Sequence, residues 1–343
     1  MQISEAFMRT ALEEARKAEG HTSPNPLVGA VLAIGNRIAT RAHHRRAGLP
    51  HAEIECLRKF GRKIPNNAVL YVTLEPCSTA GRTPACTQEI IKLGVKRVVV
   101  GSIDPNPKHS GRGIELLRSA GVNVAVGVLA EECTALNPAF NKWIATGMPF
   151  VIGKCAMSLD GHLSRPGNEP RWISSSKSRA HARALRGKVD AIVVGANTVR
   201  TDNPRLTVRG VAGAGQPLRV ILTRSGKFSK RSHVFTDRFR KRTLIYRSRS
   251  LRSVLHDLGQ QNVSSVLIEG GGEMLGEALD AGLIDRAHIY LGPILTGGGA
   301  IAFSGKGAGE TSAGARLQAV KYQKIGQDVW ISGDVRYGPW ATE

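Results

Sequence analysis

One histidine and two cysteines between residues 51 and 86 place the strongest constraint on the fold of this chain. His51 is followed two residues later by Glu53, and Cys77 and Cys86 lie further along, with Cys77 directly after Pro76. One imidazole and two thiolates suit Zn²⁺, which catalytic sites bind through three protein ligands while a fourth position stays open to water. We therefore expect a fold that brings His51, Cys77 and Cys86 together around one zinc ion.

Glu53 is predicted to act in the chemistry at this zinc rather than as a ligand. A catalytic zinc lowers the pKa of its water toward roughly 7, and a nearby carboxylate can take and return the proton. Residues two apart do not share a face of a helix, so His51 and Glu53 converge only if a helix points its N-terminus at the metal. Pro50 fits the start of such a helix, and Pro84 predicts a second helix start just before Cys86.

The motif resembles one that is typical of nucleobase deaminases, in which His-x-Glu is followed by Pro-Cys-x-x-Cys. Here eight residues, not two, separate the cysteines. Each residue alone has a structural explanation, because a histidine often precedes a helix and cysteines are often small buried hydrophobic residues. The ordered set of four favours a metal centre over that explanation.

Length and cysteine content bound the class of protein. The chain has 343 residues, which predicts two domains. No apolar run approaches the roughly 18 residues of a membrane span, and no secretory signal is visible at the start. Of the five cysteines, Cys56, Cys133 and Cys155 are expected to be buried free thiols. This pattern fits a reducing compartment and predicts a cytoplasmic protein.

The formal net charge is +21, and twelve basic residues lie between Arg219 and Arg252, where Asp237 is the only acid. A nucleic-acid partner is one interpretation of this charge. The aromatic residues of the segment are, however, spaced like core anchors rather than as a stacking platform. We therefore favour a solvated basic surface with pockets for phosphorylated small molecules.

Predicted strands and helices alternate in the first half, which indicates a three-layer α/β domain. The helices are expected at residues 4–18, 51–60, 84–93 and 113–120. The strands are expected at residues 27–34, 37–41, 67–74, 95–103 and 122–129.

Several motifs of this half resemble the deaminase half of the bifunctional deaminase/reductase family of riboflavin biosynthesis. They are PNPLVG at residues 24–29, PHAE at 50–53, YVTLEPC at 71–77, GRTPAC at 81–86 and DPNP at 104–107. The resemblance implies a cytidine-deaminase-like fold, and the longer spacing between cysteines is the rule in that family. It also implies that Asn25 and His44 contact the pyrimidine, and that Arg82, Asp104 and Asn106 contact the ribosyl phosphate.

The second half begins after a junction at Gly147, and we expect domains at residues 1–147 and 148–343. Strands are predicted at 150–156, 189–195, 218–222, 243–246, 265–269 and 286–291, and helices at 178–186 and 273–281. The strand at 265–269 runs into three glycines, whose free N–H groups at a helix start would suit a phosphate. Leu275 stands where a G-x-G-x-x-G motif has its third glycine, so a tight turn explains these glycines equally well. The tail from Lys306 suggests no site.

This half resembles the reductase half of the same family, which has a dihydrofolate-reductase-like α/β fold and uses NADPH. The motifs are SLDG at residues 158–161, WI at 172–173, LR at 185–186, DAI at 190–192 and EGGG at 269–272. The resemblance implies that NADPH is bound by Ala156, Trp172, Thr198, Asp202, Gly271, Gly272, Glu273, Met274, Leu275, Gly276 and Glu277. It implies that the substrate is bound by Arg186, Leu206, Arg209 and Glu269.

Lys154 and Glu269 are our candidates for the proton transfers that accompany opening of the ribose ring. One residue departs from the family pattern, since Thr223 follows a predicted strand where we expect an acid. This departure affects the contact that position 223 is expected to make with the cofactor, and not the assignment to the family.

We thus expect a zinc-dependent deamination of a diamino-ribosylamino-pyrimidinone 5′-phosphate, followed by NADPH-dependent reduction of the ribosyl group to ribityl. We also expect a homo-oligomer, either a dimer or a tetramer. One alternative is an RNA deaminase with a basic binding domain, which predicts salt-dependent RNA binding and no affinity for NADPH. Another is a deaminase whose second domain serves only in oligomerisation.

Overall fold

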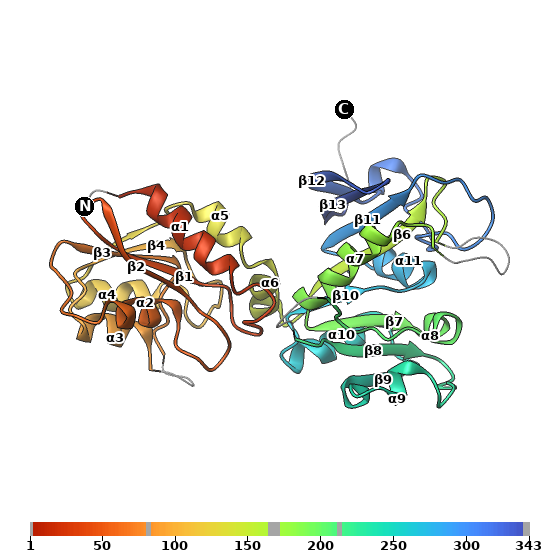
Figure 1. The fold of residues 1–343 in the computed structure, drawn as a ribbon, viewed down its shortest axis with the longest axis horizontal. Coiled ribbons are helices and arrows are strands. Elements are labelled where there is room, and N and C mark those ends of the chain that lie inside the picture. Colours follow the sequence, from red (N-terminus) through yellow and green to blue (C-terminus); the bar gives the residue numbers. More distant parts are fainter. Residues whose placement is uncertain (1–2, 80–83, 164–171, 211–214, 339–343) are drawn as a thin grey trace. The chain divides into compact units, whose positions relative to one another are not determined.

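The computed structural model describes residues 3–79, 84–163, 172–210 and 215–338. The chain divides into two compact units, Met1–Gly147 and Met148–Glu343. Each unit has its own sheet with helices on both faces (Figure 1). None of the helices in the described ranges is long and apolar enough to cross a membrane.

The first unit contains a five-stranded sheet with the order β2-β1-β3-β4-β5. Strand β1 runs antiparallel to both β2 and β3, whereas β3, β4 and β5 are parallel. The strands are β1 (Gly29–Ile34), β2 (Arg37–His43), β3 (Ala68–Leu74), β4 (Arg97–Ser102) and β5 (Asn123–Val126). Because β3 and β4 are parallel neighbours, their carboxyl ends deliver the segments after residues 74 and 102 to the same edge of the sheet.

Two hydrophobic cores cover the two faces of this sheet. Side chains alternate along β1, so that Val31 packs in one core and Leu32 in the other. Helices α1 (Glu5–Arg16) and α5 (Ala130–Ala135) pack on the Val31 side. The Leu32 side is covered by α2 (Ala52–Phe60), α3 (Cys86–Lys92) and α4 (Arg112–Ser119), and α6 (Pro138–Thr146) ends the unit. This arrangement confirms the expected three-layer deaminase-like fold.

The second unit contains an eight-stranded sheet with the order β12-β13-β11-β6-β10-β7-β8-β9. The six strands from β11 to β9 are parallel, and β13 and β12 join antiparallel at one edge. The strands are β6 (Phe150–Ser158), β7 (Ala191–Gly195), β8 (Leu218–Thr223), β9 (Thr243–Arg247), β10 (Ser265–Ile268), β11 (Arg286–Gly292), β12 (Arg316–Ile325) and β13 (Asp328–Arg336).

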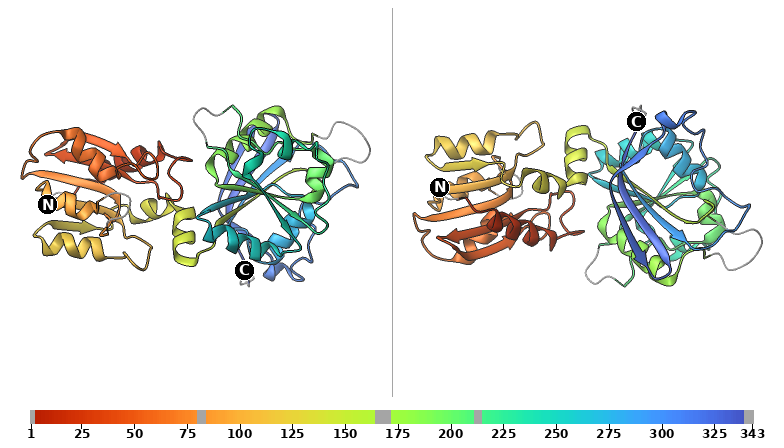
Figure 2. Two further views of the ribbon diagram at one scale, coloured as in Figure 1. Left: turned by 90° about the horizontal axis from the view of Figure 1, so that it is seen from below. Right: turned by 90° about the horizontal axis from the view of Figure 1, so that it is seen from above.

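Helices lie on both faces of this second sheet, as Figure 2 shows from two further sides. They are α7 (Ser176–Leu185), α8 (Ala196–Asp202), α9 (His233–Thr236), α10 (Leu251–Gln260) and α11 (Gly272–Asp280), and 3₁₀ turns lie at Arg186–Lys188, Arg240–Arg242 and Thr311–Ala313. One core contains α10 and α11, and the other contains residues of α7, α8 and α9. The expected dihydrofolate-reductase-like α/β arrangement is present.

Two stretches differ from the sequence expectations. The strand expected at 122–129 ends at Val126, because Gly127 and Leu129 have positive φ angles of 95° and 53° and turn the chain into α5. The tail forms the antiparallel pair of β12 and β13. Strand β12 is an edge strand whose residues are mostly exposed, so it lacks the buried apolar pattern by which strands are recognised.

Candidate functional site

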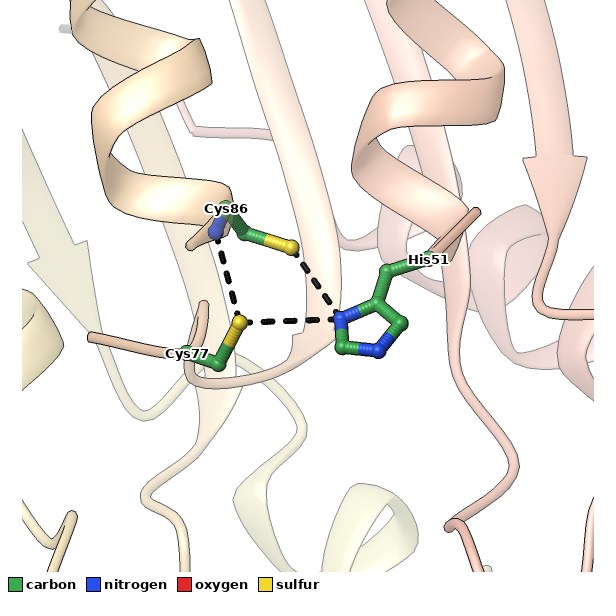
Figure 3. A group of neighbouring side chains, drawn as sticks. All are labelled: His51, Cys77 and Cys86. Carbon is green, nitrogen blue, oxygen red and sulfur yellow. Dashed lines mark hydrogen bonds between the residues drawn. The ribbon is translucent and has the colours of Figure 1, made fainter. Parts of the chain in front are cut away.

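Three side chains with metal-ligating atoms converge in the first unit. His51, Cys77 and Cys86 each offer one ligand atom, and all three atoms lie within 4.8 Å of one another (Figure 3). The distance from His51 Nδ1 is 3.2 Å to the Sγ of Cys86 and 3.6 Å to the Sγ of Cys77. The predicted ligand set is therefore assembled by the fold.

Local structure explains how residues far apart in sequence meet here. His51 is the N-cap residue of α2, Cys86 is the first residue of α3, and Cys77 follows the end of β3. Both helices therefore point their N-termini at the cluster, as Figure 3 shows. Helix α3 starts at Cys86, two residues after Pro84, the residue from which a helix start was predicted.

The electrostatics of the cluster favour a thiolate. The hydrogen bond with the Cys86 thiol and that with His51 lower the pKa of Cys77 to about 4, against the effect of burial. The backbone N–H of Cys86 also donates to the Sγ of Cys77 at 3.3 Å. Nitrogen and thiolate donors at this spacing fit a tetrahedral zinc ion.

Glu53 is buried beside the cluster, with 3% of its surface exposed. Its Oε2 atom has no hydrogen-bond partner among the described residues. Burial raises the pKa of this carboxyl above its ordinary value, and the positive charge of His51 opposes the shift. A buried carboxylate oxygen without a partner is costly, and its position suits an exchangeable ligand or water that supplies the missing contact.

Asn25 and His44 form a hydrogen-bonded pair next to this cluster. Asn25 Nδ2 lies 3.0 Å from His44 Nε2, and His44 Nδ1 lies 3.1 Å from the carbonyl oxygen of Pro50. The His44 ring meets the His51 ring edge-on, with centroids 5.2 Å apart. Burial lowers the pKa of His44, so the ring is neutral at pH 7 and Asn25 donates to it. The carbonyl oxygen of Asn25 remains available as an acceptor.

Asp104 and Asn106 lie in a turn that follows β4. Asp104 Oδ1 accepts a hydrogen bond from the N–H of Asn106 at 2.9 Å, and Asn106 Oδ1 accepts one from the N–H of Lys108 at 3.1 Å. Both side chains therefore shape the turn itself. Burial raises the pKa of Asp104. Arg82, the remaining residue expected at the phosphate, lies outside the described residues.

Sequence reasoning did not single out Glu75, which holds this turn in place. Its carboxylate accepts hydrogen bonds from four backbone N–H groups, those of Asp104, Gly111, Gly113 and Ile114. Glu75 stands two residues before Cys77, so one buried side chain connects the metal cluster to the Asp104–Asn106 turn. The only sign of this role in the sequence is that Glu75 directly follows a buried strand.

In the second unit, Arg186 and Glu269 form a two-point ion pair. Arg186 Nε donates to Glu269 Oε1 at 2.7 Å, and Nη2 donates to Oε2 at 2.6 Å. Burial alone would raise the pKa of Glu269, but the charge and hydrogen bonds of Arg186 outweigh it and lower the pKa. Glu269 is thus ionised at neutral pH, which suits an acceptor better than an acid.

Lys154 lies on β6 in line with Glu269, because β6 and β10 pair in parallel with Gly153 opposite Ile268. Its positive charge also contributes to the lowered pKa of Glu269. The Nζ atom lies 5.9 Å from the ring centroid of Tyr290. The structure thus brings together Lys154 and Glu269, the candidates for the proton transfers, and Arg186, which is expected to bind the substrate.

The segment after α8 brings Leu206 and Arg209 toward the same ion pair. Arg186 Nη1 donates to the carbonyl oxygen of Thr207 at 3.3 Å, and Leu206 is buried with a positive φ of 51°. Burial and the charges of Arg183, Arg186 and Arg205 lower the pKa of Arg209. Several cations close to one another suit an anionic group of a ligand.

A cavity of about 1330 Å³ opens at the carboxyl ends of β7, β8, β9 and β10. The expected cofactor residues that line it are Thr198, Gly271, Gly272, Glu273, Met274 and Glu277. Ala156, Trp172 and Asp202 do not line it. Leu275 is fully buried in the core, and Gly276 packs against the backbone of Ser304 and Gly305, so neither faces the cavity. Its size and the glycine-started helix α11 fit a dinucleotide.

Comparisons with known protein families agree with this geometry. The family described as the cytidine and deoxycytidylate deaminase zinc-binding region matches residues 1–102. The RibD C-terminal domain family matches residues 149–331. Each unit of the structure therefore corresponds to one matched family.

Similar proteins match nearly the whole chain. The riboflavin biosynthesis protein RibD of Aquifex aeolicus is 37% identical over 350 residues, covering 96% of this chain and 98% of that protein. RibD of Synechocystis is 40% identical over 316 residues, covering 86% and 85%.

Solved structures give the same result. Acinetobacter baumannii RibD has a TM-score of 0.89 at 31% identity and covers 97% of this chain and 98% of that one. A Thermotoga maritima diaminohydroxyphosphoribosylaminopyrimidine deaminase/5-amino-6-(5-phosphoribosylamino)uracil reductase has a TM-score of 0.85 at 34% identity over the same shares. The resemblance seen in the sequence is confirmed, and the chain belongs to the RibD family of riboflavin biosynthesis, whose members join a zinc-binding deaminase domain to a reductase domain.

Proposed function

We propose that the unit of residues 1–147 removes an amino group from a diamino-ribosylamino-pyrimidinone 5′-phosphate, and that the unit of residues 148–343 reduces the ribosyl group of the product. The observation that carries the first assignment is the convergence of His51, Cys77 and Cys86 beside the buried carboxylate of Glu53. The second rests on the ion pair of Arg186 and Glu269 near Lys154, and on the cavity of the same unit that Gly271 and Gly272 line.

In the deaminase unit, His51, Cys77 and Cys86 are the residues that would hold zinc. Zinc at this place supplies activation of a water molecule for hydrolysis. Glu53 would take a proton from the attacking water at its unpaired Oε2 and return it to the departing amine, a role that its burial and raised pKa support. The same burial excludes bulk water from the carboxylate.

Asn25 and His44 are proposed to orient the pyrimidine. His44 is neutral and bonded at both ring nitrogens, so its contribution is to fix Asn25 and to pack against His51. Asn25 then offers its carbonyl oxygen to a ring N–H. The Asp104–Asn106 turn and Arg82 are proposed to contact the ribosyl phosphate, and the role of Arg82 stays a prediction.

In the reductase unit, Lys154 is proposed to handle the proton that accompanies opening of the ribose ring. Its ammonium group carries three donors on a flexible stem. Glu269, held ionised by Arg186, accepts a hydrogen bond from the substrate and orients Lys154 through its charge. NADPH supplies the hydride when it is bound. Leu206 and Arg209 complete the wall on the substrate side.

The cofactor residues are proposed to be those at the cavity, namely Thr198, Gly271, Gly272, Glu273, Met274 and Glu277. Ala156, Trp172 and Asp202 remain predictions that follow from the resemblance. All five cysteines are free, and Cys56, Cys133 and Cys155 are buried, which supports a reducing, cytoplasmic compartment. A dimer or tetramer stays a prediction, and light scattering of the purified chain tests it.

Mass spectrometry of the product tests both assignments together. The diamino-pyrimidinone ribosyl phosphate is incubated with the zinc-loaded protein, with and without NADPH. Exchange of an amine for oxygen in both samples, and two added hydrogens only with NADPH, is the expected result. Exchange without reduction would overturn the second assignment, and no exchange would overturn the first.

A further inference from the structure

Lys154 stands on the middle one of three neighbouring strands, because β6 lies between β10 and β11 in the sheet. On the β10 side, Glu269 is close enough for the charge of Lys154 to contribute to its lowered pKa. On the β11 side, Nζ of Lys154 lies over the ring of Tyr290, 5.9 Å from its centroid. The ammonium group therefore has a carboxylate on one side and an aromatic face on the other.

Tyr290 is fixed in its position and is uncharged. Its side chain is fully buried, and its hydroxyl oxygen lies 2.8 Å from Nδ1 of His181, a hydrogen-bond distance. Burial and the negative charge of Glu269 raise the pKa of Tyr290, so the hydroxyl keeps its proton at neutral pH. The face of an aromatic ring carries partial negative charge and attracts a cation, most strongly where water is excluded.

The groups behind Tyr290 are also held in place and neutral. The ring of His181 meets that of Trp330 edge-on, with centroids 5.1 Å apart, and Nε1 of Trp330 donates to Nδ1 of His288 at 3.2 Å. Burial lowers the pKa of His181, and it lowers that of His288 to about 4. Neither imidazole therefore carries a charge that competes with Lys154 for the ring.

One helix holds both groups that flank Lys154. His181 lies in α7 and bonds Tyr290, and Arg186 directly follows the last residue of α7 and bonds Glu269 at two points. A lysine side chain is a flexible four-carbon stem that reaches many positions unless its surroundings restrict it. The two fixed neighbours restrict the ammonium group to the space between them.

We propose that Tyr290 is a positioning residue of the reductase reaction, and that its ring face holds the ammonium group of Lys154 at the place where it meets the ribose. This inference rests on the proposed reductase function. Catalysis depends strongly on the placement of the reacting groups, so a group that places a proton donor affects the rate. Tyr290 acts through Lys154 and needs no contact with the substrate.

A series of fluorinated residues at position 290 of the full chain tests this role. Tyr290→Phe is the parent, and mono-, di- and trifluorinated phenylalanine are then introduced at the same position. Each fluorine draws electron density from the ring face and weakens its attraction for a cation, while the size of the ring changes little. NADPH oxidation with the deaminated product as substrate gives kcat and the KM for NADPH.

Tyr290→Phe keeps the ring and should keep most of the reductase activity. Along the fluorinated series, kcat should fall stepwise, on the order of tenfold in total, as expected for the loss of one desolvated cation–π contact. The KM for NADPH should not change. In the Lys154→Ala background the series should have no effect on the residual rate, because the ring acts through the ammonium group.

The matched control is the same fluorinated series at Phe150, whose ring lies 5.4 Å from the guanidinium carbon of Arg286. This pair joins the same two strands, since Phe150 is in β6 and Arg286 is in β11. Fluorination at Phe150 should leave kcat unchanged, because that cation has no part in the reaction.

Three results would overturn the role of Tyr290 while the reductase assignment stands. They are a kcat that does not respond to fluorination, an equal response in the Lys154→Ala background, and a Tyr290→Phe parent that binds NADPH but is inactive. The last result would assign the effect to the hydroxyl group instead of the ring. A wild-type protein that does not oxidise NADPH would overturn the reductase assignment and this inference with it.

Discussion

The carboxylate of Glu75 accepts a hydrogen bond from the backbone N–H of Gly113 at 2.8 Å, in the first turn of α4. A Cβ at position 113 would overlap the carbonyl oxygen of Pro76, so only glycine permits this approach. The contact joins the end of β3, which delivers Cys77, to the segment that contains Asp104. One buried glutamate therefore couples the geometry of the metal cluster to that of the proposed phosphate contact.

Glu75→Gln is expected to loosen this coupling. An amide has only one acceptor oxygen. Its NH₂ group is a donor and would face backbone N–H groups that now donate to the carboxylate, so those hydrogen bonds would be lost. Because hydrogen bonds to charged groups contribute about 1.5–3 kcal/mol each, we expect a loss of about 2 kcal/mol in the free energy of unfolding of the first unit. The KM for the substrate should rise more than kcat falls. Urea unfolding and deaminase kinetics measure both.

The control for this substitution is Glu115→Gln, which changes an exposed glutamate of α4. It should leave both stability and KM unchanged. An unchanged KM in Glu75→Gln would remove Glu75 from the positioning role.

Glu53→Gln is expected to abolish deamination while zinc stays bound. The amide cannot carry the proton, and general acid–base catalysis contributes on the order of 10²–10⁴-fold to rate. Elemental analysis of the purified variant reports the zinc content, and release of ammonia reports activity. Glu55→Gln, in the same helix but paired with Arg45, should keep both. Loss of zinc in Glu53→Gln would mean that Glu53 holds the metal instead.

Cys77→Ser and Cys86→Ser should each lose zinc, because a hydroxyl does not replace a thiolate as a zinc ligand at neutral pH. Cys56→Ser is the matched control. Its thiol is also buried but bonds Thr40 instead of the cluster, and burial raises its pKa to about 11. Elemental analysis of the three variants distinguishes them. Full zinc content in either of the first two would exclude that cysteine as a ligand.

The proposed zinc ligands of the first unit could be predicted from the sequence because their chemistry is local and specific. His51, Cys77 and Cys86 are side chains whose types restrict the metal, and helix starts and a buried strand predicted how they meet. Glu75 could not be found in this way. Its function depends on backbone N–H groups that lie 29 to 39 residues further along the chain, and a backbone donor leaves no trace in side-chain types.

Prediction from sequence is limited in the same way at the proposed cofactor cavity of the second unit. A glycine-rich helix start predicted the region, yet Leu275 and Gly276 lie on the core side of α11, which the spacing alone did not reveal. Residues at the ends of β8 and β9, such as Thr223 and Ser248, line this cavity together only because the two strands are neighbours in the sheet. Strand order is set by packing of the whole unit, and a list of predicted strands does not contain it.

Lys154→Ala is expected to impair reduction and spare deamination. Removal of the ammonium group leaves the ribose without its proposed proton donor, so the rate of NADPH oxidation should fall on the order of 10²-fold. Lys177→Ala, an exposed lysine of α7, is the control and should oxidise NADPH at the wild-type rate. Separate assays with the diamino substrate and with its deaminated product measure the two steps. Equal damage to both would contradict the assignment of the activities to separate units.

The ion pair of Arg186 and Glu269 predicts a pH-dependent contribution to stability. The pKa of Glu269 is lowered in the folded chain, so it binds a proton less readily folded than unfolded. The contribution is therefore complete above the ordinary pKa of a glutamate and is lost as the pH falls through the lowered value. Both side chains are largely buried, with exposed fractions of 13% and 10%.

Arg186→Gln would leave the carboxylate of Glu269 buried without its partner. Breaking a buried pair in this way costs about 3–5 kcal/mol, so the second unit should be destabilised by that amount at pH 7. Without Arg186, burial raises the pKa of Glu269, and protonation on acidification relieves the cost. The difference from wild type should thus begin to shrink above the ordinary glutamate pKa of 4.5 and shrink further below it. Urea unfolding at pH 7 and pH 4 measures this difference.

The control is Arg286→Gln, which breaks the ion pair of Arg286 and Asp334. These two side chains are 34% and 37% exposed, so the loss should cost at most about 1 kcal/mol at either pH. A difference for Arg186→Gln that stays constant with pH would show that the ion pair is not its source.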